Sequence, residues 1–252
     1  MPDNDSWFSL HSDRLTMRMP GGGSIAVPFD SLANTRLANP ESAASRALQR
    51  AGTRILGLMR DYEPQPKIQR QFLHHDRPDV ISNLRNLYTA TARLHKEAED
   101  TVASWLKVEN LSDLRAATIL STLQGQKQAE LVKRAHADAT VAAVVLDPVF
   151  YAALGLDEAS RPQLERSIAH ANLTRLHLAS PSARRPSLSD PMAEKPDAQY
   201  AARMADIQMA GVDTMRAEVS AGLQWIGAAT AFVAGMSEDT PAAVFDAVAA
   251  AA

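Results

Sequence analysis

The sequence predicts a mainly α protein, an elongated helical bundle with a small β-hairpin at its N-terminus and a long helix near its C-terminus. Apolar residues recur at helical spacing over most of the chain, and many of them are Ala, the strongest helix former. Only 5 % of the residues are aromatic, so the predicted core is poor in bulky side chains. With 252 residues, the chain is long enough to bury a sizeable core.

Composition excludes several classes of function. The chain contains no Cys, so it has no disulfide scaffold, no thiolate zinc site and no cysteine nucleophile. A net charge of −3 disfavours a nucleic-acid-binding protein with a basic surface overall, although a local basic patch remains compatible with it. The first ten residues are acidic and lack the apolar run of a secretory signal, so we expect a cytoplasmic protein that is not secreted.

Residues 14–29 form two short alternating runs around a Gly-rich turn, which predicts a β-hairpin. The glycines at the turn, Gly21, Gly22 and Gly23, also suggest a phosphate-binding loop. They lack both the Lys-Ser/Thr pair of a Walker loop and the GxGxxG spacing, so the hairpin turn is the preferred interpretation.

A first helix is predicted over residues 39–62. Asn39 is the expected N-cap, and the prolines that follow the segment end it. Along this helix a basic row recurs every four residues, at Arg46, Arg50 and Arg54. Such a row can bind phosphates or an acidic surface, which makes nucleic-acid contact one candidate function, while a solvated helix face is the simpler interpretation.

Two further helices carry long apolar stripes, over residues 78–107 and 198–236. The second is longer than a compact domain of this size usually needs, so we expect both stripes to be covered by another polypeptide. The predicted interface residues are Leu84, Leu87, Leu94, Val102, Trp105, Val212, Met215, Val219, Leu223, Trp225, Ile226 and Val233.

Residues 219–236 form the most hydrophobic window, at the lower limit of the length that spans a bilayer. Small residues in this window let a neighbouring helix approach closely, in a membrane or in a subunit interface. We favour the subunit interface and expect no membrane contact. The small residues are Ala221, Gly222, Gly227, Ala228, Ala231 and Gly235.

The remaining segments complete the predicted organisation. A single helix capped by Asn110 or Ser112 and running to about residue 146 is expected, with a weak point or a solvent-exposed stretch around Gly125 but no break. A helix over 158–178 follows it. A short helix begins at Thr240-Pro241. The expected parts are a hairpin region (1–35), a helical bundle (36–178), a Pro- and Ser-rich linker or strap (179–197) and the long helix with a short terminal one (198–252).

The densest group of metal-ligand side chains lies at residues 72–79. Within this group, His75 is followed directly by Asp76 and preceded by His74. This His-Asp pair resembles the metal-binding His-Asp pair of the HD phosphohydrolases, which are all-helical enzymes. The resemblance implies a divalent metal, an upstream His and a downstream Asp. Only His11 precedes the group, and nothing selects a downstream Asp. The alternative is that Asp76 and Asp79 form an exposed turn that caps the following helix.

Two other pairs of possible metal ligands have helical spacing. They are His95 with Glu99 and His170 with His177. Neither belongs to an HExxH or a Glu-x-x-His motif, so exposed helix polarity is the better interpretation of both. No nucleophile or P-loop motif is found. We therefore predict a protein that is not an enzyme and needs no cofactor.

Residues 138–156, DATVAAVVLDPVFYAALGL, resemble a stretch of uncharacterised helical proteins encoded among the structural genes of tailed phages. The resemblance implies a virion component or assembly factor, present in the host cytoplasm and in the particle. It carries no catalytic residues. The predicted function is therefore a helical structural protein whose partners are copies of itself or other structural proteins, and the alternatives are an HD-like phosphohydrolase or a nucleic-acid-contacting protein.

Overall fold

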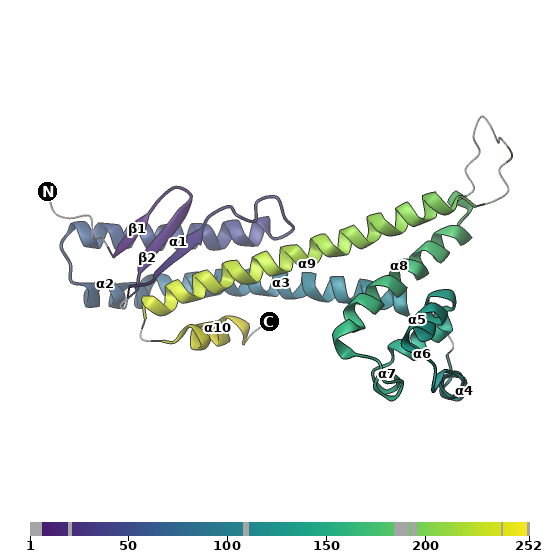
Figure 1. Cartoon of the computed structure of the whole chain (residues 1–252). Helices are drawn as coiled ribbons and strands as arrows, with labels where there is room; N and C mark the ends of the chain where they lie inside the picture. Colours follow the sequence, from purple (N-terminus) through teal and green to yellow (C-terminus); the bar gives the residue numbers. More distant parts are fainter. Residues whose placement is uncertain are drawn as a thin grey trace. The chain divides into compact units, whose positions relative to one another are not determined.

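The computed structural model describes residues 7–19, 22–107, 111–183, 192, 196–237 and 239–250. Residue contacts divide the chain into two compact units, and each unit is described by itself. Unit 1 comprises residues 1–96 and 215–252, and unit 2 comprises residues 97–214. The predicted fold class is confirmed, because the chain is mainly α, with a small sheet near its N-terminus and a long helix near its C-terminus (Figure 1).

The predicted hairpin is present in unit 1, with a further strand paired to it. The strands pair in the antiparallel order β1-β2-β3, with Phe8 opposite Met17 and Leu15 opposite Val27. These four side chains are buried on one face, as the alternating pattern requires. Gly21 lies outside the described residues, and Gly22 has a φ of +95°, as a tight turn requires. The strands are β1 (Phe8–Leu10), β2 (Arg14–Arg18) and β3 (Ser24–Pro28).

Helix α1 (Ala38–Arg60) agrees with the first predicted helix except at its start. The expected N-cap, Asn39, is wrong, because the capping position is Leu37 and it makes no side-chain hydrogen bond to the helix. Glu41 instead holds the start of the helix. Its carboxylate is buried and accepts hydrogen bonds from the backbone N–H groups of Ser31 and Leu32, at 2.7 and 3.0 Å. A tertiary contact therefore performs the role that a local cap was expected to have.

The segment predicted to be an exposed turn at residues 72–79 is helical, which corrects that interpretation. A π-helical turn, η1 (Phe72–Asp76), joins α2 (Gln65–Gln71) to α3 (Arg77–Leu106). Pro78 lies just after this turn. A proline donates no hydrogen bond and crowds the carbonyl four residues earlier, and a widened turn at that point relieves the conflict without ending the helix.

Unit 1 is built around the close packing of α3 against the C-terminal half of α9 (Ala198–Gly235). A Cβ atom added at Gly222 would lie 2.7 Å from Leu37 Cδ1 and 2.9 Å from Thr91 Oγ1, so the absence of a side chain there permits the approach. The Trp225 indole N–H donates to the Pro28 carbonyl, at 2.7 Å, and links α9 to the sheet. Phe232 packs edge-on against Phe72, which closes the same core.

Unit 2 begins with three short helices where one was expected. The predicted weak point at Gly125 is a break, because its φ is +77°, and a second break falls at Asp138. Asp138 caps the next helix, with its carboxylate accepting from Thr140 N at 2.7 Å. Of the two candidate caps, Ser112 is the N-cap of the first helix, and Asn110 lies outside the described residues. The three helices are α4 (Asp113–Leu123), α5 (Gln128–Ala137) and α6 (Ala139–Leu146), and α7 (Pro148–Ala153) follows them.

The later helices agree with their predicted positions. The 3₁₀ turn η2 (Glu158–Ser160) leads into α8 (Arg161–Ala179), and η3 (Pro181–Ala183) follows it. Most of the predicted linker, 179–197, lies outside the described residues. Thr240 caps α10 (Pro241–Ala249) as expected. Within the described part of the chain, no helix combines the length and the apolar character needed to cross a membrane.

Candidate functional site

Most of the residues predicted to form an interface are instead buried within the chain. The prediction that they contact another polypeptide is therefore wrong for these side chains, because the two long helices and the elements around them already remove both stripes from solvent. Val102 and Trp105 are half-buried, and Leu223 is 44 % exposed. The buried members are Leu84, Leu87, Leu94, Val212, Met215, Val219, Trp225, Ile226 and Val233.

The small residues of α9 divide into two groups. Gly222 and Gly235 face the interior, where a Cβ would contact Thr91 and Leu37 at the first and Met17 and Met19 at the second. Gly227 faces outward, with no atom within 4 Å of the position of a Cβ. Gly222 and Gly235 thus permit close packing within the chain, where close packing between subunits was expected. Gly227 remains on the surface.

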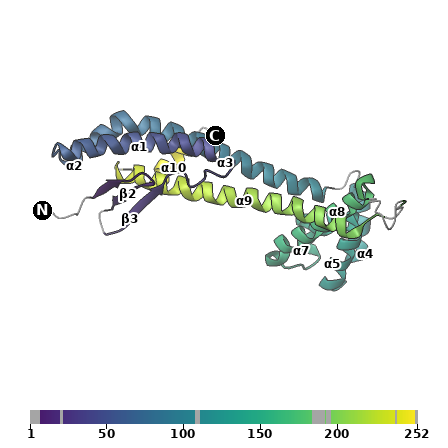
Figure 2. The ribbon, with the colours of Figure 1, turned by 90° about the horizontal axis from the view of Figure 1, so that it is seen from above.

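The outward group belongs to a surface that we call the uncharged face of α9. No charged residue occurs between 219 and 235, although solvent-facing helix surfaces usually carry charge. In Figure 2, α1 and α3 run along one side of this part of α9, and strands β2 and β3 lie on the other side near the C-terminal end of the helix. Its exposed members are Ser220, Leu223, Gln224 and Gly227, and its half-buried members are Ala221, Ala228 and Ala231.

Two sites predicted separately, the basic row and the His-Asp group, lie beside each other. Arg50 pairs with Asp79 at 2.7 Å, and Arg54 Nε lies 3.5 Å from Asp76 Oδ1. Arg46 donates instead to Ser42, within its own helix, at 2.8 Å. Two of the three arginines are therefore partly neutralised by carboxylates from η1 and α3.

The His-Asp group does not converge on one point. His74 and His75 are exposed, whereas Asp76 is buried and its Oδ2 has no hydrogen-bond partner. Burial raises the pKa of the Asp76 carboxyl above its usual range, although Arg54 opposes the effect. In the ranges that the structure describes, no three His, Asp or Glu side chains are arranged to hold a metal ion.

Unit 2 contains a groove of about 490 Å3 between α5, α8 and α9. Its charged side chains are paired with each other. Arg166 makes a bidentate pair with Asp213, with both distances 2.6 Å, and His170 Nε2 lies 3.0 Å from Asp206 Oδ1. His136 Nε2 lies 3.1 Å from Ser167 Oγ, which also donates to the Leu164 carbonyl. The direction of the His136–Ser167 hydrogen bond depends on the tautomer of His136.

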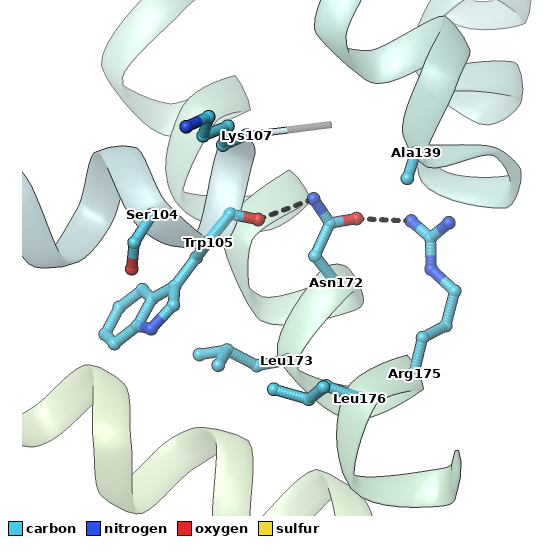
Figure 3. A pocket seen from close by; sticks show the side chains of 8 residues that line it. All are labelled: Ser104, Trp105, Lys107, Ala139, Asn172, Leu173, Arg175 and Leu176. Atoms are coloured by element: carbon cyan, nitrogen blue, oxygen red, sulfur yellow. Dashed lines mark hydrogen bonds between the residues drawn. The ribbon is translucent and has the colours of Figure 1, made fainter. Parts of the chain in front are cut away.

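A smaller pocket in unit 2, of about 260 Å3, lies where α3 ends against α8. Asn172 is its central polar residue, because its amide donates to the Trp105 carbonyl at 2.9 Å and its oxygen accepts from Arg175 at 2.6 Å (Figure 3). Two basic residues lie at its rim. Lys107 follows the last residue of α3, and Arg175 belongs to α8. The full lining is Ser104, Trp105, Lys107, Ala139, Asn172, Leu173, Arg175 and Leu176.

The remaining His pairs do not form sites with each other. His95 and Glu99 are exposed on α3. His170 pairs with Asp206 of α9 and not with His177, whose Nε2 is buried without a hydrogen-bond partner. The partners of His170 and Arg166 lie 36 and 47 residues away along the chain, so no local pattern in the sequence indicated these contacts.

Comparison of the chain with protein families, with characterised proteins and with solved structures finds no match to any of them. The segment that resembles tailed-phage proteins, 138–156, forms α6 and α7 and supplies much of the buried core of unit 2. Asp138 and Asp147 within it are helix N-caps. Its residues thus have structural roles in this chain.

Proposed function

We propose that this protein is a non-enzymatic helical assembly protein, a component or assembly factor of a tailed-phage particle, and that it associates with further copies of itself through the uncharged face of α9. One observation carries the proposal. An outward helix surface without charge, which includes the partly exposed Leu223 and the open position at Gly227, is suited to contact with another helix.

The composition of the face supports helix packing over ligand binding. The side chains of Ala221, Ala228 and Ala231 are short, so a second helix can approach the backbone of α9 closely. Gly227 lies among these side chains and has no atom within 4 Å of the position of a Cβ, so a neighbouring helix can contact its backbone directly.

Sedimentation of the full chain with two matched variants tests the self-association. Gly227→Glu places a charge in the proposed contact, and Gly211→Glu places the same charge at another exposed glycine of α9 that is equally open. We expect the wild type to exceed 27.2 kDa as its concentration rises, Gly227→Glu to weaken association at least tenfold, and Gly211→Glu to behave as the wild type.

A wild-type mass that stays at 27.2 kDa into the high micromolar range would contradict self-association. Equal effects of the two variants would show that the contact lies elsewhere. The phage assignment has a separate test, since a portal, terminase or tail gene beside the gene for this chain would support it and an unrelated metabolic operon would count against it.

A further inference from the structure

The pocket between the end of α3 and α8 has a charge distribution that the assembly proposal leaves unexplained. Arg175 is held in place by neutral oxygen atoms, since its Nη2 donates to Asn172 Oδ1 at 2.6 Å and its Nε donates to the Ala171 carbonyl at 3.3 Å. Neither contact neutralises the guanidinium. Among the described residues, no carboxylate lies within ion-pair distance of Arg175 or of Lys107, the second cation of the pocket.

Asp138 is an acidic residue whose charge interacts with Arg175. It caps α6 by accepting from Thr140 N, and this hydrogen bond is the main reason why the pKa of Asp138 is lowered, with Arg175 adding a smaller effect. Arg175 is therefore ordered by hydrogen bonds to neutral oxygens, and among the described residues its charge is compensated only in part, without a direct ion pair. A cation that is already ordered loses little conformational freedom when an anion binds to it.

The rest of the pocket is apolar. Figure 3 shows the Trp105 indole on one side with Leu173 and Leu176 near it, and the Arg175 guanidinium on the other side near Ala139. Asn172 lies between the two sides, and it also accepts one of the guanidinium N–H groups. A flat apolar wall facing a fixed cation matches a ligand with a ring at one end and an acid group at the other.

We propose that this pocket binds a small aromatic monoanion, a one- or two-ring carboxylate, with its ring against Trp105 and Leu173 and its carboxylate on Arg175, while Lys107 on the other side of the pocket adds only longer-range attraction. The volume of about 260 Å3 lies just below the range of about 300–1,000 Å3 typical of drug-sized ligands, which limits the ligand to a small one. All the residues involved belong to unit 2, so this site is independent of the uncharged face of α9.

Calorimetric titration of the full chain with three probes tests the two halves of this recognition. 2-Naphthoate carries both ring and charge, 2-naphthalenemethanol carries the ring alone, and acetate carries the charge alone. We expect saturable binding of 2-naphthoate, at least tenfold weaker binding of the alcohol, and no measurable binding of acetate. Equal affinity for the alcohol and the carboxylate, or no saturable binding of 2-naphthoate up to millimolar concentration, would overturn the proposal.

Three variants place the ligand in the pocket. Arg175→Gln should weaken 2-naphthoate binding at least tenfold, Lys107→Gln should weaken it about threefold, and Arg93→Gln, which removes an exposed arginine of α3 outside the pocket, should leave it unchanged. Far-UV circular dichroism checks folding, and Lys107→Gln alone decides the test if Arg175→Gln is unfolded. Unchanged binding in the folded pocket variants would overturn the proposal, as would a single-stranded oligonucleotide that binds tenfold tighter than 2-naphthoate and depends on Arg175.

Discussion

The start of α1 in unit 1 is held differently from the starts of three short helices in unit 2, although α10 of unit 1 has a local cap at Thr240. In unit 2, α4, α6 and α7 each begin at a Ser or Asp side chain that accepts a hydrogen bond from the first turn. In unit 1, α1 and α2 have no such cap, and α1 is held by the buried carboxylate of Glu41, which reaches out of the helix to the preceding loop. Helix ends are thus fixed locally in several places in unit 2 and by tertiary contact at α1.

The largest effect is expected at Glu41. Its carboxylate is 1 % exposed and accepts three hydrogen bonds from Ser31 and Leu32. Glu41→Ala leaves the buried N–H of Leu32 and the partly buried N–H of Ser31 unpaired, so the free energy of unfolding should fall by about 2–4 kcal/mol in urea titration. Glu63→Ala, which removes a surface ion pair with Lys67, should change it by less than about 0.5 kcal/mol. A similar small loss at Glu41 would contradict the tertiary role.

A smaller effect is expected at the crossing of α9 and α3. Gly222→Ala places a Cβ 2.7 Å from Leu37 and 2.9 Å from Thr91, whose buried hydroxyl is bonded to the Leu87 carbonyl and has little freedom to move. Unfolding free energy should fall by about 1–3 kcal/mol, measured by urea titration. Gly227→Ala on the outward surface should raise it by about 0.5–1 kcal/mol. The same sign in both variants would contradict the assigned faces.

The smallest effect is expected at a local cap in unit 2. Asp138→Ala removes the acceptor for Thr140 N and should lower the free energy of unfolding by about 1 kcal/mol at pH 7. The pKa of Asp138 is lowered in the folded chain, so its stabilisation is present above the usual carboxyl pKa of 3.8 and is lost as the pH falls through the folded pKa. Urea titrations should therefore show the two proteins converging below about pH 3.8. A difference that is constant from pH 7 to pH 3 would contradict the cap.

The contrast between local caps and tertiary contacts explains which features of the fold the sequence predicted. The caps at Ser112 and Thr240 and the boundaries of the long helices followed from local signals, because capping and helical periodicity act over a few residues. The continuous helix expected through Gly125 was wrong, since its apolar spacing extends across a break that the positive φ of one glycine creates. The sequence also grouped Gly222 and Gly227 as small residues of one window and did not distinguish the interior glycine from the exposed one.

The candidate sites show the same limit. The sequence identified the arginine row and the Asp residues after His75 as separate features, and only the folded chain brought Arg50 to Asp79 and Arg54 to Asp76. The pocket at Asn172 had no signal, because Trp105 lies 67 residues away from it along the chain.

By itself, the sequence determined the helical class, the lengths of the two long helices and the capped starts of several short ones. Each of these depends on hydrogen bonds and side-chain spacing within a few turns of backbone. The tertiary structure alone decided which apolar stripes are internal, which glycines face solvent and which charges are paired. Those outcomes depend on contacts between residues far apart in the chain, and the free energy of such contacts is set by packing and burial that no local pattern encodes.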